Sequence, residues 1–363
     1  MAEFKPFRTL TVFQCQKDSL LATITADKLE QWLNAIPFKH VEVGTIRSGW
    51  DFPHPAYQTR VAAQGQNFMF RLATEQKKIS ISQRDSLIME REEKWREQNP
   101  GKNVERDLHN DFKNQVEAEL LRNNFILHTT MCEGWFNVAE GFLIINSASE
   151  NAVNSFIDLL GKAASLEERE NVELLLDPVV PNEEVSFTLK RWITNPENVP
   201  YGFDIGRSLS LSGGEKNDTV GCEIGYKQFK LEKDKHAPDY LKEGYSVRTL
   251  SLLYDSNDDF SAPTDSADDV EVEGAEAPTD DSPVENSLNA SFKVTSKGTI
   301  TDFSLGKCYK AFLRGSEHDK KNQAACFDAE MFAYTTMALP VYQEIMKVFG
   351  GFHAEPKNTE SID

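Results

Sequence analysis

The sequence has no run of eighteen or more apolar residues, so it predicts no transmembrane helix. The first eight residues include Lys5, Pro6 and Arg8, and they lack the apolar stretch and small-residue cleavage site of a secretory signal peptide. Hydrophobic residues make up 39% of the 363-residue chain, which is enough for the cores of two or three domains. We therefore expect a cytoplasmic protein without a membrane partner.

Cysteine and histidine are sparse. The five cysteines are odd in number and far apart, without a CxxC or a Cys-His cluster, which argues against a disulfide framework and a zinc site. The seven histidines are scattered along the chain and form no metal-like pair. The sequence therefore predicts no metal site and no cofactor.

The usual catalytic motifs are also absent. There is no GxxxxGK[ST], GxGxxG, GxSxG or HExxH, and the glycine-rich stretch 212–216 lacks the spacing of a phosphate loop. Glu92 and Lys94 form an ExK motif, but no aspartate-bearing strand precedes it, so a solvated helix face is the favoured interpretation over a nuclease site. We expect that the protein is not an enzyme and has no catalytic residues.

The net charge of −19 argues against a surface that is basic everywhere, because DNA affinity depends largely on neutralising phosphates with Lys and Arg. Residues 255–285 hold twelve Asp and Glu and no Lys or Arg, so the rest of the chain carries only −7. A DNA-binding surface would therefore be local.

The first part of the chain alternates between strands and helices. We expect strands at 9–13 and 65–73, a turn at 48–53, and a helix at 26–35 with Thr25 as its N-cap. Further strands are expected at 126–130, 134–138 and 141–146, before a helix at 150–164 capped by Ser149. Between them, residues 83–122 are charge-dense with apolar residues at helical spacing, and Asn99-Pro100-Gly101 breaks the pattern. This segment predicts an αα-hairpin that projects from the body.

The second part of the chain is predicted to be strand-rich, with a final helix. Strands are expected at 185–188, 220–223, 247–254, 290–295 and 299–305, and a helix at 328–349 that is kinked at Pro340 and stopped by Gly350-Gly351. The acidic stretch has almost no apolar residues and predicts a disordered insertion. The last dozen residues predict a frayed tail.

Several short motifs follow one another in a distinctive order. They are Phe4-Lys5-Pro6-Phe7, Gly49-Trp50-x-x-Pro53, Gly65-Gln66 before a strand that ends in a Glu75-Gln76-Lys77-Lys78 turn, Thr129-Thr130-Met131, Ser147-Ala148-Ser149, Gly202-Phe203, Tyr226-Lys227-Gln228 and Phe327-Asp328-Ala329-Glu330-Met331. In this order the chain resembles the RdgC family of recombination-associated proteins. It departs from the family in its acidic insertion, its added tail and its low content of basic residues.

The resemblance implies an α+β protein with antiparallel sheets, packed helices and a projecting helical hairpin, the finger. Apart from the acidic disordered insertion at 255–287 and the tail at 352–363, it divides the chain into a central sheet domain at 1–82 and 124–180, the finger at 83–123, and a base domain at 181–254 and 288–351. It also implies a ring-like homodimer that passes duplex DNA, binds it with little sequence preference, obstructs the recombinase RecA and associates with the nucleoid.

Site residues follow from the resemblance and from the basic residues available. Phe125 matches a family aromatic at one dimer contact, and Lys227 with Gln228 matches a pair at the other contact, facing the DNA. The expected DNA contacts are Arg84, Arg91, Lys102, Lys227, Gln228 and Lys230, and further candidates are Lys94, Arg96, Arg106, Lys233 and Lys235. The aromatics Tyr226 and Phe229 beside the last group suit backbone or stacking contacts.

Plainer interpretations stand beside these. The finger charges also suit a solvated helix with i,i+4 ion pairs, and Phe125 suits a packing aromatic. The acidic insertion is either a solubilising loop or a mimic of DNA charge. The alternative function is an interaction protein of the same fold that binds DNA weakly or not at all and engages a recombination or nuclease protein through its acidic surface.

Overall fold

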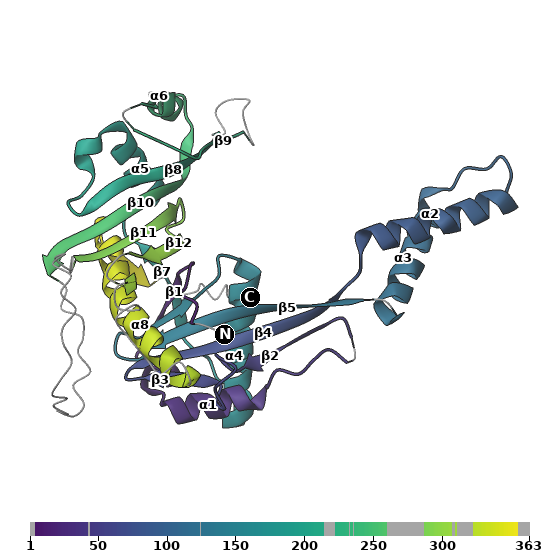
Figure 1. Cartoon of the computed structure of the whole chain (residues 1–363), viewed down its shortest axis with the longest axis horizontal. Coiled ribbons are helices and arrows are strands. Elements are labelled where there is room, and N and C mark those ends of the chain that lie inside the picture. The colour runs from purple at the N-terminus through teal and green to yellow at the C-terminus, as the bar shows by residue number, and fades with distance from the viewer. Residues whose placement is uncertain are drawn as a thin grey trace, which may run out of the picture.

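The computed structural model describes residues 4–42, 44–123, 125–213, 222–231, 233–234, 236–259, 287–306, 309–310 and 322–354. Its strands form two antiparallel sheets with helices packed against them, which confirms the predicted α+β class. An eight-stranded sheet carries a projecting arm, and a five-stranded sheet lies at the other side of the molecule (Figure 1).

The eight-stranded sheet has the order β13-β7-β1-β6-β5-β4-β2, and β3 pairs with β4 off this path. The strands in chain order are β1 (Thr11–Cys15), β2 (Ile46–Asp51), β3 (Val61–Gln64), β4 (Asn67–Lys78), β5 (Ile126–Asn137), β6 (Phe142–Ile145), β7 (Leu176–Pro181) and β13 (Phe352–Ala354). β4 and β5 pair along their whole length, whereas β6 pairs with β5 only over 134–137. The paired strands β4 and β5 therefore extend beyond the end of β6 as a ribbon that projects from the rest of the sheet. We call residues 46–48, 74–78 and 126–132 the stalk.

Two helices cover one face of this sheet. Helix α1 (Ala26–Ala35) starts where the Thr25 hydroxyl accepts a hydrogen bond from the Lys28 amide, and α4 (Glu150–Glu168) starts at the equivalent Ser149 cap. They follow the short 3₁₀ helix η1 (Leu20–Thr23) and β6, respectively. Trp32 and Phe156 are almost fully buried in the core under them. Burial of each such aromatic contributes about 1.5–3 kcal/mol, so both predicted helices are fixed by packing as well as by their caps.

The other face packs against the second half of the chain. Helix α8 (Gln323–Val348) lies between the two sheets, and its residues share one core with both (Figure 1). The predicted kink residue Pro340 lies inside this helix. The five-stranded sheet has the order β12-β11-β10-β8-β9, formed by β8 (Phe203–Ser212), β9 (Glu223–Tyr226), β10 (Ser246–Asp259), β11 (Ser287–Thr295) and β12 (Ile300–Leu305).

The strand predicted at 185–188 is wrong. These residues open helix α5 (Val185–Thr194), which is followed by η2 (Pro196–Asn198) and later by α6 (His236–Lys242). Val185, Leu189 and Trp192 are buried on one side of α5, at helical spacing. The β-forming residues misled the prediction because packing against the sheet overrides local propensity.

Two predicted turns are also wrong. Residues 48–51 belong to β2, and 75–78 continue β4 to its end. The strands expected separately at 126–130 and 134–138 form one strand, β5. Each segment is polar or glycine-containing, but pairing with its neighbours keeps it extended.

The structure describes the start of the predicted tail and both ends of the predicted insertion. Phe352–Ala354 form β13 and pair with β7, so this part of the expected tail is a strand. Positive φ angles at Gly350 and Gly351 end α8 and turn the chain toward that strand. β10 extends to Asp259 and β11 begins at Ser287, so both ends of the expected insertion are strands. Residues 260–286, which hold most of the expected insertion, lie outside the described residues. Residues 220–221 of the strand expected at 220–223 also lie outside them.

Candidate nucleic-acid interface

The arm consists of the stalk and a helical hairpin, α2 (Ile81–Gln98) and α3 (Arg106–Asn123), as predicted for the finger (Figure 1). The apolar core of the hairpin is small: among the described residues of α2 and α3, only Ile88, Val116 and Leu120 are buried. The hairpin therefore needs other contacts to hold its helices together.

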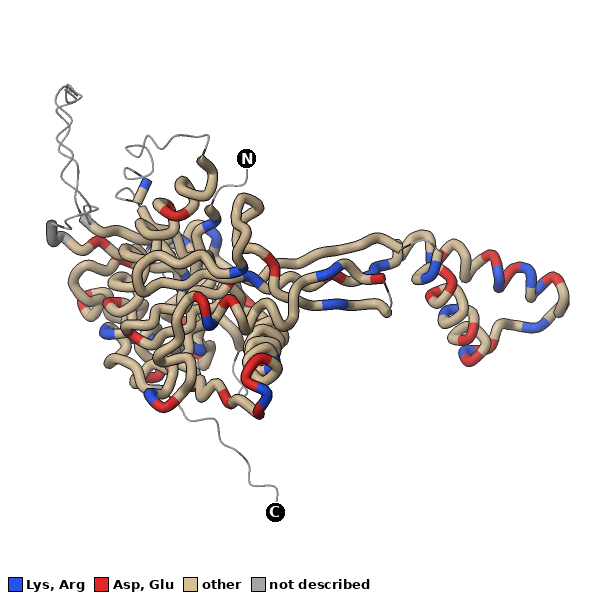
Figure 2. The backbone as a smooth tube through the Cα atoms, turned by 90° about the horizontal axis from the view of Figure 1, so that it is seen from below, with Lys and Arg blue, Asp and Glu red and all other residues tan. Residues whose placement is uncertain are grey.

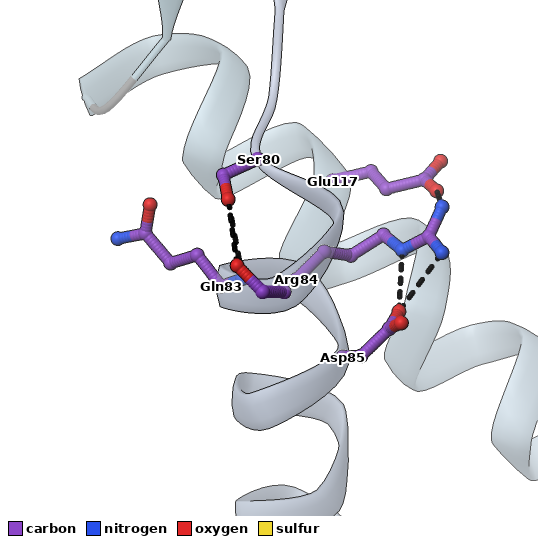
Figure 3. Close-up of polar contacts among 6 residues, drawn as sticks. Ser80, Gln83, Arg84, Asp85 and Glu117 are labelled. Atoms are coloured by element: carbon purple, nitrogen blue, oxygen red, sulfur yellow. Dashed lines mark hydrogen bonds and ion pairs between the residues drawn. The ribbon is translucent and has the colours of Figure 1, made fainter.

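Arg84 supplies one of these contacts. Its Nε donates to Asp85 Oδ1 at 2.9 Å and its Nη1 donates to Glu117 Oε1 at 3.3 Å, so one guanidinium joins α2 to α3 (Figure 3). Hydrogen bonding to Asp85 raises the pKa of the Arg84 guanidinium. The Ser80 hydroxyl, labelled at the start of α2 in the same figure, also accepts a hydrogen bond from the Gln83 amide at 3.5 Å and so caps the helix; the dashed line drawn from it runs to the Ser82 hydroxyl. The charge of Arg84 is thus already matched by carboxylates within the protein.

Arg91 is arranged in the same way. Its Nη2 donates to Glu119 Oε2 at 2.6 Å and its Nη1 to Gln115 Oε1 at 3.1 Å, again from α2 to α3. These pairs differ from the expected i,i+4 pattern, because they link the two helices and not successive turns of one helix.

Among the other finger cations, Lys94 and Arg96 are paired at the expected i,i+4 spacing, whereas Arg106, Lys113 and Arg122 form no ion pair with a described residue. Lys94 pairs with Glu90 at 2.6 Å, and Arg96 and His109 both reach the Glu92 carboxylate. Figure 2 shows Lys and Arg interspersed with Asp and Glu along the hairpin. Lys102, in the loop between the helices, is exposed and makes no ion pair with the described residues. Of the three predicted finger contacts, it is the one whose charge is not internally balanced.

The stalk carries basic residues that the sequence analysis missed. Arg47 and Lys78 are exposed and form no ion pair within the described part of the chain. Lys77 Nζ donates to the Glu42 carbonyl at 3.3 Å and lies 4.5 Å from the centre of the Phe125 ring. The sequence analysis predicted a turn at Lys77 and Lys78, so it did not predict that they lie on the projecting β4–β5 ribbon.

The acidic residue among them, Glu75, is turned inward. Its side chain is 2% exposed, and its carboxylate accepts hydrogen bonds from the Val41 amide at 2.7 Å and the Thr129 hydroxyl at 3.2 Å and lies 2.9 Å from His40 Nδ1. These contacts lower the pKa of Glu75, and the hydrogen bond from the Val41 amide has the largest effect. The basic side chains of the stalk therefore face solvent while this carboxylate does not.

We predict that Glu75→Gln lowers the free energy of unfolding at pH 7 by about 1.5–3 kcal/mol, because hydrogen bonds to a charged acceptor are lost. Since the folded-state pKa of Glu75 is depressed, its stabilisation is present above the unfolded-state pKa and disappears as pH falls through the folded value. Urea unfolding from pH 7 to pH 3 should show the two proteins converging in acid. A constant difference across that range would contradict this assignment.

Lys227, Gln228 and Lys230 lie together just after β9, in the base part of the chain. Lys227 and Gln228 are exposed, and Lys230 is exposed while its amide donates to Asp234 Oδ2 at 2.8 Å. Between them Phe229 is only 2% exposed and its amide donates to the Arg207 carbonyl at 2.8 Å. Phe229 therefore anchors the segment, and the stacking contact suggested for this aromatic is not open to a nucleic acid.

Phe125 immediately precedes β5 and is half-buried beneath Lys77. The β5 residues that follow, 126–132, pair with β4 on one side and with no described strand on the other. Ile126, Leu127 and Met131 are exposed along this edge by 62%, 45% and 44%. An unpaired apolar strand edge of this kind is a surface for pairing with another chain.

A scan against protein-family models matches residues 6–264 to the family described as "Putative exonuclease, RdgC". The match spans more than half of the chain. The chain belongs to the RdgC family. The RdgC match covers the large sheet except β13, the finger, and Lys227 with its neighbours, and it ends before β11, β12 and α8. A search of curated proteins found no match.

Membership of the RdgC family supports a recombination-associated DNA-binding role in general terms. Within the described ranges, no group of three or more His, Cys, Asp or Glu side chains is arranged to hold a metal ion. No described helix is both long and apolar enough to span a membrane.

Proposed function

We propose that the protein binds duplex DNA without sequence preference as a ring-like homodimer and modulates homologous recombination by obstructing RecA on the nucleoid. The observation that carries the proposal is the stalk, where an unpaired apolar strand edge lies beside exposed cations. Family membership supports the DNA-binding part of it.

The strand edge supports the homodimer. Two copies of β5 could pair antiparallel along 126–132, which would satisfy the free backbone groups and cover Ile126 and Met131. Phe125 would then lie at one end of the shared edge. A second contact through the region of Lys227 would close a ring, since β9 is an edge strand and lies on the side nearer the arm in Figure 1.

A ring explains how a chain of net charge −19 could hold a polyanion. Phosphate contacts position a protein on DNA without specifying sequence, and enclosure of the duplex prolongs residence without base contacts. The candidates are the exposed cations Arg47, Lys78, Lys102, Lys227 and Lys230.

The direct experiment measures mass in solution and DNA binding together. Sedimentation should give a dimer, and gel shifts should show duplex binding that weakens steeply between low and moderate salt. A monomer both with and without duplex would contradict the ring.

We predict that Lys227→Glu lowers affinity for duplexes of different sequence by the same factor and reduces the salt dependence of binding, with a slope change of about 1. The reason is that Lys227 is exposed and would contact phosphate and not bases. Lys17→Glu, an exposed lysine on the body, is the matched control. If the two variants lowered duplex affinity equally, Lys227 would not contact the DNA.

We further propose that DNA binding occurs without catalysis. Linear duplex and single-stranded DNA, incubated with the protein and Mg²⁺ or Mn²⁺, should keep their length. Progressive shortening that survives further purification would instead support the exonuclease activity named in the family description.

The second candidate is an interaction protein that engages a recombination or nuclease protein through its acidic surface. It is favoured by the internal pairing of Arg84 and Arg91 and by the negative net charge. Absence of DNA binding even at low salt, where electrostatic attraction is least screened, would support this candidate.

A further inference from the structure

A cavity of about 200 Å³ opens on the face of the large sheet opposite α1 and α4, next to the start of α8. Its apolar lining includes Phe4, Phe7, Met69, Met131 and Phe327. Phe4 and Phe327 meet edge to face with ring centres 5.3 Å apart, which fixes one wall. A dry apolar cavity of about 150 Å³ can hold a benzene ring, so this one has room for a phenyl group.

Arg71 lines the same cavity and is incompletely paired. Its Nη2 reaches Asp51 Oδ2 at 3.4 Å, while its Nε is buried and has no hydrogen-bond partner among the described residues. A buried donor on a charged group is rarely left without an acceptor. The Arg71 side chain is 18% exposed, so a ligand can reach the guanidinium.

A second cation lies beside Arg71 at the cavity. Lys5 lines the cavity, is exposed, and makes no ion pair with a described residue. Glu133, directly across from Arg71 on β5, comes within 4 Å of neither cation and accepts from Asn146 Nδ2 at 3.3 Å. Asp51 pairs with Arg71, so two carboxylates stand beside the two cations, but the Arg71 Nε–H and the Lys5 ammonium still have no acceptor among the described residues.

We propose that this cavity binds the C-terminus of a peptide that ends in phenylalanine. The terminal carboxylate accepts hydrogen bonds from Arg71 and an ion pair from Lys5, and the phenyl ring enters the space between Phe4, Met69 and Phe327. A C-terminal residue carries its carboxylate and its side chain on one carbon, which matches an adjacent cation and apolar cavity. The planar guanidinium suits a carboxylate, to which it can donate two parallel hydrogen bonds.

A single aromatic ring fits into about 200 Å³, with the rest of the ligand outside the cavity. A nucleobase is also a planar ring, so adenosine monophosphate is the competitor in the test below. The rest of the peptide would leave through the open side of the cavity. Met131 lines the cavity and would also be covered in the proposed β5–β5 contact, so the peptide and a second copy of the chain would compete for this side of the stalk.

The test uses the full chain and the probe N-acetyl-Gly-Ser-Gly-Phe, compared with the same peptide as its C-terminal amide. The neutral residues avoid repulsion by the acidic protein. Calorimetry should show one site for the acid and binding weaker by at least about tenfold for the amide, because a charge-assisted hydrogen bond is lost. This comparison needs no variant and so does not depend on the folding of one.

Arg71→Gln should bring the affinity for the acid down to that for the amide, while Lys162→Gln, an exposed lysine on α4, should leave it unchanged. Replacing the terminal Phe of the probe with Ala should abolish binding. Equal binding of acid and amide, no binding of either, or displacement of the acid by adenosine monophosphate at lower concentration would overturn the proposal.

Discussion

Replacing Lys77 and Lys78 together with glutamate is expected to lower duplex affinity at low salt by at least about tenfold. The two residues lie side by side at the end of β4, on opposite faces of the ribbon. Lys78 is exposed and forms no ion pair within the described ranges, and Lys77 is bound only to a backbone carbonyl and an aromatic face. Both charges are therefore available to phosphates, unlike the guanidiniums of Arg84 and Arg91.

The salt dependence gives the sharper measurement. Each phosphate contact that is lost should reduce the slope of log affinity against log salt by about 0.9, so the double variant should lose about 1.8. Lys17→Glu with Lys162→Glu changes the net charge equally but on the body, away from the arm. It should lower affinity slightly and leave the slope unchanged.

A finger variant distinguishes the stalk from the helices. Arg91→Gln removes a charge that Glu119 already balances, so it should affect duplex binding less than Lys78→Glu. It should instead weaken the hairpin, which has few apolar contacts. If Arg91→Gln abolished binding while Lys77 and Lys78 could be reversed without effect, the DNA contact would belong to the finger.

The sequence predicted the elements whose signals are local. Helices α1 and α4 have an N-cap followed by apolar residues at helical spacing, and both occur as expected. The hairpin α2–α3 was indicated by a charged periodic pattern around Asn99-Pro100-Gly101. The order of the short motifs indicated the RdgC family, and the family-model match over residues 6–264 confirms it.

The prediction was wrong where distant partners decide the structure. The segment 75–78 is polar and charged, and it is a strand because it pairs with residues 126–129 and, at 75 and 76, with β2. Phe352–Ala354 form a strand because β7 offers a free edge, which is formed by residues far away in the sequence. α5 contains β-forming residues, yet it packs its buried side as a helix.

The candidate site divides in the same way. Exposure of Lys227 and Gln228 agrees with a surface role, and their roles in DNA binding stay predictions. The pairing of Arg84 with Glu117 joins residues 33 positions apart, so helical spacing could not reveal it. Arg47 was missed because its place on the stalk depends on the register of β2 with β4.

A glycine at the base of the stalk should be among the least replaceable residues in the protein. Gly49 lies in β2, and a Cβ there would come within 2.6 Å of Phe38 Cα and 2.8 Å of the Pro37 carbonyl carbon. These are backbone atoms, and they are held in place by hydrogen bonds on both sides of Trp50: its amide donates to Ile36, and its carbonyl accepts from Phe38, each at 2.9 Å. No side-chain rotation can relieve the contact.

Gly49→Ala is therefore expected to lower the free energy of unfolding by about 3 kcal/mol, the upper part of the range for overpacking. Gly225→Ala is the matched control, since Gly225 also lies in a strand and a Cβ there would meet nothing within 4 Å. That variant should stay within about 0.5 kcal/mol of the parent protein in urea unfolding. Equal stabilities for the two variants would mean that residues 36–38 do not lie against β2. Because this strand forms one side of the stalk, the same variant should also weaken the presentation of Arg47 and, with it, duplex binding.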